Sequence, residues 1–321
     1  MVKKPTLILL VIAIAAGLAV YYFDWKRSQN EKPAADTSKP AFSVDASAIS
    51  SFTISHPGLA GDVPIHFEKR NGVWWIAQPI ETQADASTAE GIVDQLSEDR
   101  VTQTEPGTEN RRKAYGLDPP QASIEFQLQN GSKHTLLIGN KDFSGDSLYA
   151  VIDGGQSVAL LPAVIGESAG KPLQQLRDRS VLHLDTANLQ RVEIHDENGD
   201  VVLSSTKNKP DQWTIEEPAA QKGKHAPAWK VIDPFTSLQA TDVIDHPTSK
   251  QVASLANPAI KAVFTSADGK QVTLRISKPS GDTLYAQTSG TSALYTLSKQ
   301  SLDSLNLKPA DLSLSDAGVN P

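Results

Sequence analysis

Short stretches in which apolar and polar residues alternate recur along most of the chain. Ile49–Ser55 alternates in this way, as is typical of a half-buried strand. Two similar runs, Ile65–Lys69 and Val73–Ile76, are joined by a turn that contains Asn71-Gly72, a strong hairpin signal. Apolar residues then recur at helical spacing from Ala89 to Leu96. The pattern predicts three strands and then a helix whose apolar face packs on their sheet.

A second group of strands follows this helix. The four runs at 122–128, 135–138, 148–152 and 158–161 are separated by glycine-rich turns and predict a meander. Leu173 and Leu176 then indicate a short closing helix. The order of strands, helix, strands and helix predicts an α+β fold with a mainly antiparallel sheet and packed helices.

The same order of motifs occurs twice. The segment Ser144–Ala150 returns almost unchanged as Ser280–Ala286. Further matched pairs, in chain order, are Val44 with Leu184, Trp74 with Trp213, Leu117 with Leu255 and Tyr149 with Tyr285. Their offsets fall steadily through 140, 139, 138 and 136 residues, as expected when one copy has lost single residues in its loops. We therefore expect two tandem domains, each long enough to bury its own core, at residues 42–180 and 181–314, with a tail at 315–321.

The helix of the second copy should differ from that of the first. Val231, Ile232, Phe235 and Leu238 form its apolar face, but Pro234 interrupts the pattern. Proline removes a helical hydrogen bond, so this helix should be kinked or should start late.

An uncharged run precedes both copies. Thr6–Phe23 holds 18 residues without a charge, which is long enough for a short transmembrane helix. Lys3 and Lys4 place its start on the cytoplasmic side, so the body is expected in the periplasm of a bacterium, anchored by one pass in the inner membrane. We assign residues 1–27 to a signal-anchor and 28–41 to a flexible tether. A cleaved signal peptide is the alternative, because Ala13-Ile14-Ala15 fits an A-x-A cleavage site.

Composition excludes several classes of function. The chain has no cysteine, so lipoprotein anchoring, disulfides and thiolate metal sites are all excluded. Outside the anchor and its flanking charges, 26 basic and 36 acidic residues give a net charge of −10. A body of this charge is not expected to bind nucleic acid.

Four features together resemble a known family. They are the strand end Trp74–Pro79, the turn Tyr115–Pro120, the strand Leu148–Ala150 and the N-terminal apolar run. In this combination the chain resembles a bacterial family catalogued as domain of unknown function 4340. The resemblance implies an extracytoplasmic, membrane-tethered protein whose relatives often accompany ABC-type export or gliding-like transport components. It supplies no catalytic residues, and the second copy has Ala253-Ser254 where the family pattern has Tyr-Gly.

The candidate catalytic and metal motifs lack the context that they need. Gly166–Gly170 fits the G-x-S-x-G pattern around a nucleophilic Ser168, but Lys171-Pro172 stands where the helix should follow, which favours a simple loop. None of the seven histidines lie four residues apart on a predicted helix, so a metal site is not expected. Asp196–Asp200 is spaced as a hairpin turn rather than as a calcium loop. We expect no catalytic residue, metal ligand or cofactor.

Aromatic and basic residues supply the remaining candidates. Trp74 and Trp213 recur at the same repeat position, which indicates core positions. Trp75 lies on the other face of its strand and is not repeated, so it is a candidate partner contact, as is the basic pair Arg111 and Arg112. The signature residues expected to have structural roles are Trp74, Trp213, Tyr115, Gly116, Leu117, Pro119, Tyr149 and Tyr285.

The sequence leaves three hypotheses for function. The first is a non-enzymatic, membrane-anchored accessory or scaffold protein within a membrane-protein complex, attached to an ABC-type export or gliding-like system. The second is a periplasmic binding module that holds a glycan or peptide between the two copies. The third is a serine hydrolase built on Ser168. No residue pattern identifies a small-molecule substrate.

Overall fold

The structure is a computed structural model that describes residues 38–209, 212–305, 307 and 312. The expected anchor at Thr6–Phe23 and the tail at 315–321 lie outside the described residues. Within the described part, no helix has both the length and the apolar character needed to cross a membrane. The chain divides into two compact units, and the second begins at Pro172 apart from the short segment Thr82–Ala86.

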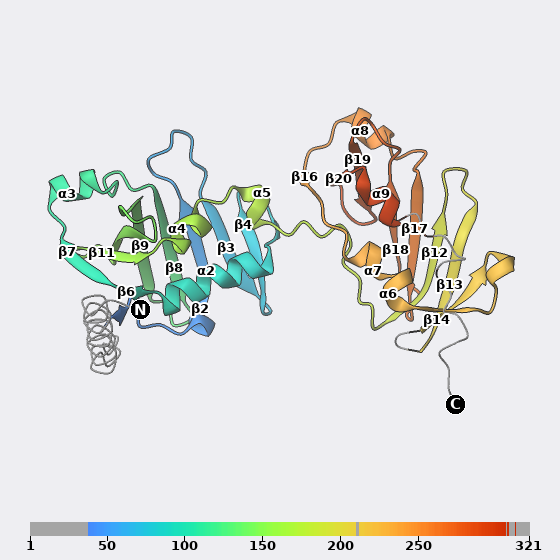
Figure 1. Ribbon diagram of the computed structural model, residues 1–321, viewed down its shortest axis with the longest axis horizontal. Helices are drawn as coiled ribbons and strands as arrows, with labels where there is room; N and C mark the ends of the chain where they lie inside the picture. The colour runs from blue at the N-terminus through green and yellow to red at the C-terminus, as the bar shows by residue number, and fades with distance from the viewer. Residues whose placement is uncertain (1–37, 210–211, 306, 308–311, 313–321) are drawn as a thin grey trace, which may run out of the picture. The chain divides into compact units, whose positions relative to one another are not determined.

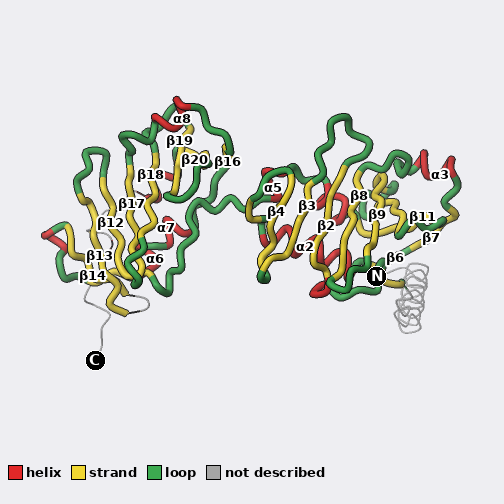
Figure 2. Tube along the Cα trace, turned by 180° about the vertical axis from the view of Figure 1, so that it is seen from behind, coloured by secondary structure: helices red, strands yellow, loops and turns green. Residues whose placement is uncertain are grey.

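The first sheet is nine-stranded and mainly antiparallel, with the order β5-β4-β3-β2-β8-β9-β10-β11-β7, and all of its strands except β5 belong to the first unit (Figures 1 and 2). Its strands are β2 (Ile49–Ser55), β3 (Ile65–Arg70), β4 (Val73–Gln78), β5 (Thr82–Gln83), β7 (Gln103–Pro106), β8 (Ala122–Leu128), β9 (Lys133–Lys141), β10 (Ser147–Ile152) and β11 (Ser157–Pro162). A separate pair is formed by β1 (Lys39–Pro40) and β6 (Arg100–Val101). The helices are η1 (Ala46–Ala48), α2 (Ala86–Glu98), α3 (Glu109–Ala114) and α4 (Val164–Ala169).

The second unit repeats this order strand for strand, as β15-β14-β13-β12-β17-β18-β19-β20-β16. Its strands are β12 (Leu189–His195), β13 (Val201–Lys209), β14 (Gln212–Glu217), β15 (His225–Pro227), β16 (Asp242–Ile244), β17 (Ile260–Ser266), β18 (Gln271–Ile276), β19 (Thr283–Thr288) and β20 (Leu294–Ser298). Its helices are α5 (Leu173–Leu176), η2 (Ala219–Gln221), α6 (Ala228–Val231), α7 (Asp233–Thr236), α8 (Ser249–Ala253) and α9 (Gln300–Leu305).

The segment of α5 and its C-cap Arg177 is hydrogen-bonded to residues in and after β16. The guanidinium of Arg177 donates to both carboxyl oxygens of Asp245 at 2.9 Å, and Gln174 Nε2 donates to the carbonyl of Val243 at 3.3 Å. The segment that follows Pro172 is thus bonded to the β16 region of the second unit.

The matched motifs occupy equivalent strands. Trp74 lies in β4 and Trp213 in β14, which are both second in their sheet orders. Tyr149 lies in β10 and Tyr285 in β19, which also correspond. The register agrees too, because β2 and β12 each have seven residues and each shift their pairing after the first residue. The structure is therefore mostly antiparallel sheet, in two copies of one strand order.

Each sheet buries one face. In the first unit the ring of Phe52 lies 4.3 Å from that of Phe67 and 5.2 Å from that of Trp74, between centroids. Residues Ala89, Ile92, Val93 and Leu96 of α2 are buried as expected, and Figure 1 shows α2 crossing this part of the sheet. Trp74 and Trp213 are each 2% exposed, so both tryptophans are core residues.

Two helices bear on the sequence predictions. Pro234 does interrupt the helix of the second copy, which is divided into α6 and α7. The loop predicted at Gly166–Gly170 is wrong, because Gly166 to Ala169 lie within α4 and Gly170 caps it. Gly166 faces the sheet so closely that a Cβ there would stand 2.7 Å from Leu148 Cδ2. The glycine thus permits close packing of helix on strand rather than a turn.

Candidate functional site

Trp75 lies on the face of β4 opposite to the buried Trp74 and is partly exposed. The guanidinium carbon of Arg70 stands 5.7 Å from the centroid of the Trp75 ring. Arg70 is itself paired with Glu68 at 3.1 Å and with Glu81 at 2.8 Å. Trp75 therefore contributes a ring to a polar outer face, with a cation held beside it by two carboxylates.

Arg111 and Arg112 are bound to neighbouring backbone. Arg112 donates from Nε to the carbonyl of Gly107 at 3.1 Å and from Nη2 to that of Gly155 at 2.6 Å. Arg111 Nη1 donates to the carbonyl of Pro106 at 3.4 Å. These bonds fasten α3 to β7 and to the turn between β10 and β11. The structure does not bring the arginines to Trp75, since six strands separate β7 from β4 in the sheet order.

Two of the family motifs, the Tyr115–Pro120 turn and the Leu148–Ala150 strand, meet on the outer face of β9, β10 and β11. The ring of Tyr115 stacks on that of Tyr149 with 3.8 Å between centroids, and its hydroxyl donates to Glu105 at 2.9 Å. Leu117 packs with Val151 and Val158 in a small second cluster. The hydrogen bond to Glu105 raises the pKa of Tyr115. Tyr115, Leu117 and Tyr149 therefore pack against one another or against neighbouring apolar side chains, as expected of structural residues.

The turn itself also requires its glycine. Gly116 has φ 68°, a left-handed conformation that glycine adopts without strain, and the bond from Asp118 to Pro119 is cis. In the second copy Ala253 stands in the place of Tyr115, so Tyr285 has no equivalent ring to stack on. Leu255, which matches Leu117, is buried nevertheless.

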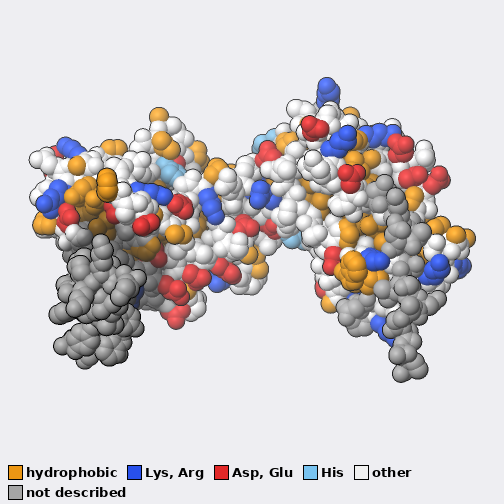
Figure 3. Space-filling view, viewed as in Figure 1, with side chains coloured by type: hydrophobic (Ala, Val, Ile, Leu, Met, Phe, Trp, Pro, Cys, Tyr) orange, Lys and Arg blue, Asp and Glu red, His pale blue; other side chains and the backbone are white. Residues whose placement is uncertain are grey.

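Large apolar side chains are exposed at one end of the first unit. They are Phe143 (106% exposed), Leu59 (65%), Val63 (58%) and Val164 (52%), and we refer to these four as the apolar loop end. Leu59 and Val63 lie in the β2–β3 loop, Phe143 in the β9–β10 loop and Val164 at the start of α4. The register places the last residues of β2, β9 and β11 at the same end of the sheet. Figure 3 shows hydrophobic side chains among charged ones on the visible face of this unit.

Hydrogen bonds hold the bases of these loops. The His56 ring bonds through Nε2 to the carbonyl of Ala169 at 3.0 Å, and its backbone N–H donates to Asp62 at 2.6 Å. Asp142 accepts backbone N–H bonds from residues in its own turn, and Lys141 pairs with Glu167 at 2.7 Å. The loop bases are thus fixed while their apolar tips face solvent.

The described residues do not form the nucleophile elbow that the G-x-S-x-G pattern would require. Ser168 is a buried residue inside α4 rather than at a strand-to-helix turn. No group of three or more His, Asp or Glu in the described part could hold a metal ion. Burial, with a smaller effect of Glu98, raises the pKa of Asp99 to about 6, and this residue directly follows the end of α2.

One known protein family matches the chain. A family model described as Domain of unknown function (DUF4340) matches residues 74–258. Neither curated proteins nor solved structures yield a match. The matched span is more than half of the 321 residues and runs from Trp74 through the stacked Tyr115 and Tyr149 into the second unit. The chain therefore belongs to the family of domain of unknown function 4340.

Proposed function

We propose that this protein is a non-enzymatic, membrane-tethered scaffold that binds a protein partner through the apolar loop end of its first unit. The observation that carries the proposal is the exposure of Leu59, Val63 and Phe143 on loops with fixed bases and of Val164 at the start of α4. Several exposed apolar side chains at one end of a sheet are typical of interaction surfaces, and a ring such as Phe143 can fill a partner's pocket.

Membrane attachment completes the proposal. The uncharged run Thr6–Phe23 supports a single-pass anchor in the inner membrane of a bacterium, with both units in the periplasm. The partner is then a component of a membrane complex, and the family resemblance favours an ABC-type export or gliding-like system. The hydrolase hypothesis gains no support, because a nucleophile elbow needs Ser168 at a sharp turn before a helix.

The second copy offers a matched control for a test. Alignment of the two Ser-Gly-Asp turns puts Pro279 in the place of Phe143. A photoreactive phenylalanine analogue at position 143 of the full-length chain, in cells, should give a discrete protein adduct that stays with carbonate-washed membranes. The same analogue at position 279 should not.

Two results would count against the proposal. Equal adducts at both positions, or none at position 143, would contradict docking through the apolar loop end. Release of the protein by carbonate would contradict the anchor.

A further inference from the structure

The outer face of the first sheet carries a shallow groove of about 220 Å³. It is lined by side chains of β2, β3, β8 and β9, chiefly Ser51, Thr53, His66, Glu125, Gln127 and Lys133. The register explains how they meet, because Ser51 lies between Glu68 and Gln127, and Gln127 lies opposite Lys133. These residues alternate with the buried Phe52 and Ile54 of the core, so they point to solvent.

The second copy provides an internal comparison, since its register is the same. Arg191 takes the place of Ser51, Glu193 that of Thr53, Thr265 that of Gln127 and Gln271 that of Lys133. On β2 the first copy therefore has short hydroxyl side chains where β12 of the second has long charged ones, whereas Gln127 and Lys133 are longer than their counterparts Thr265 and Gln271.

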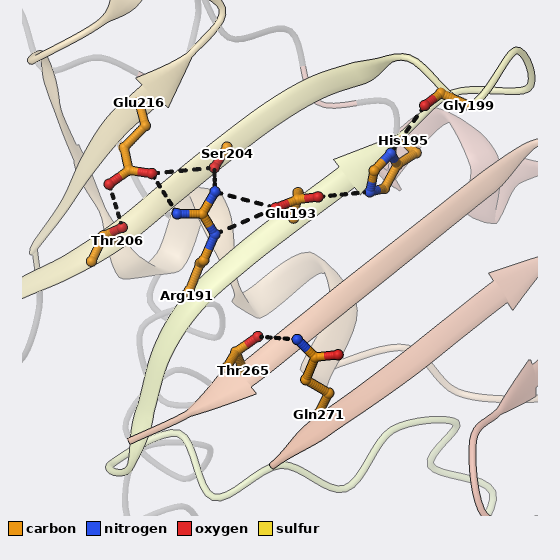
Figure 4. A network of polar contacts seen from close by, with 9 residues as sticks. All are labelled: Arg191, Glu193, His195, Gly199, Ser204, Thr206, Glu216, Thr265 and Gln271. Carbon is orange, nitrogen blue, oxygen red and sulfur yellow. Dashed lines mark hydrogen bonds and ion pairs between the residues drawn. The ribbon is translucent and has the colours of Figure 1, made fainter. Parts of the chain in front are cut away.

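Those long side chains satisfy one another (Figure 4). Arg191 bonds to Glu216 at 2.6 Å, to Ser204 at 2.8 Å and to Glu193 at 3.2 Å. His195 Nε2 lies 3.0 Å from Glu193, and Gln271 donates to Thr265 at 3.4 Å. The outer face of the second copy is thus occupied by its own ion pairs and hydrogen bonds.

The groove in the first copy is different. His66 is occupied, since its ring lies 2.8 Å from the Thr53 hydroxyl and 3.3 Å from Glu68, but the side chains of Ser51, Glu125, Gln127 and Lys133 have no polar partner among the described residues. Together they present hydroxyl, amide, carboxylate and ammonium groups with balanced charge. In the second copy the polar groups at these positions bond to one another, whereas in the first copy they are available to bind a ligand.

We propose that this groove binds a neutral oligosaccharide. Its mixed donors and acceptors suit the hydroxyl groups of sugars, and the opposite charges of Glu125 and Lys133 favour neither an anion nor a cation. Trp75 lies on the same face, two strands from β2, where the exposed part of its ring can contact the apolar side of a sugar.

Two features favour a glycan over other ligands. The groove lies on the face of inner strands whose backbone is already paired, so an extended peptide cannot add there as a strand. Its volume of about 220 Å³ is also below the roughly 300–1,000 Å³ of pockets that enclose a small molecule. The groove therefore fits one unit of a longer chain that extends along the sheet.

The test is calorimetric titration of the full-length chain with chitotetraose, cellotetraose and maltotetraose. At least one of the three should bind saturably. Gln127→Ala should weaken that binding by about tenfold or more, and so should Ser51→Arg with Thr53→Glu, which installs the residues of the second copy. Thr265→Ala, at the place equivalent to Gln127, should leave it unchanged.

Three results would contradict the binding of an oligosaccharide in this groove. Absence of saturable binding for all three sugars overturns the proposal, as does equal weakening by Thr265→Ala. Gln127 is partly exposed and its side chain bonds to no other described residue, so retained binding in Gln127→Ala, with the melting temperature of the parent, also overturns the proposal. If the double variant melts at a lower temperature, the single variant decides.

Discussion

The carboxyl group of Asp99 is partly buried in surroundings that disfavour its charged form. Its Oδ2 atom is buried without a hydrogen-bond partner in the described part of the chain, and burial raises its pKa to about 6. In the unfolded chain an aspartate titrates near pH 4. The folded state therefore binds the proton more tightly, which favours folding at low pH, and this contribution is lost as pH rises through about 6.

Asp99→Asn should consequently stabilise the protein at neutral pH. The neutral amide avoids the cost of a buried charge, and because Asp99 is only about half buried we expect a gain of roughly 1 kcal/mol at pH 7.5. Urea unfolding at pH 7.5 and 4.5 measures it, with the exposed Asp94→Asn of the same helix as control. A gain that does not shrink at pH 4.5 would contradict the assignment.

Single residues were predictable where a pattern repeats. The repeat and the two-residue period of a strand place Trp74 and Trp213 inside and Trp75 on the opposite face, and the burial agrees. Phe143 was not identified from the sequence as an exposed contact residue. A single aromatic residue in a polar loop is not part of a helical or strand repeat of apolar residues, so no pattern points to it. The one available signal was a phenylalanine within the hydrophilic segment 140–147.

At the scale of elements, the turn that carries Tyr115 is held against β9 by close backbone contact. The backbone N–H of Asn140 donates to the carbonyl of Tyr115 at 2.7 Å. A Cβ on Gly139 would collide with that carbonyl oxygen and would stand 3.0 Å from the Leu117 side chain. Gly139 thus allows the turn to lie on the strand.

Gly139→Ala should therefore displace this turn. Overpacking at such a site costs on the order of 1–3 kcal/mol. Gly91→Ala is the control, because nothing lies within 4 Å of a Cβ at that position in α2 and alanine there should stabilise by about 0.5–1 kcal/mol. Denaturant unfolding measures both changes. Equal stability of Gly139→Ala and the parent would show that the contact is not tight.

The longer elements were predictable and the shorter ones were not. Strands of six or more residues reveal an alternating period, as do β2 and β8. The edge strands β5, β7, β15 and β16 have two to four residues, too few for a period to be read. The groove depends on how four strands align across the sheet, and the sequence pattern alone does not give that register.

At the scale of the whole molecule, the two units have separate cores. The buried cluster around Trp213 consists of residues from Val181 to Leu312, all of the second unit. The repeat in the sequence predicts this organisation, because each copy carries its own set of core residues.

Trp74→Ala should accordingly damage the first unit alone. Truncation of a buried tryptophan costs about 3–5 kcal/mol, a large part of the stability of a domain. Hydrogen exchange of the full-length chain should show lost protection in β2–β4 and α2, with β12–β14 unchanged. Trp213→Ala should give the reverse pattern, whereas a uniform loss in either variant would argue against independent cores.

The strand orders also bear on aggregation. Two open sheets present four edges, and an unprotected edge is a template for pairing between chains. Here β5 and β16 offer only two and three residues, while β7 ends at Pro106 and β15 at Pro227. Proline lacks the N–H that a further strand would need, and short edges limit the number of intermolecular bonds. The shortness of these edge strands, which prevents their recognition from the sequence, thus also protects the protein from polymerising through its sheets.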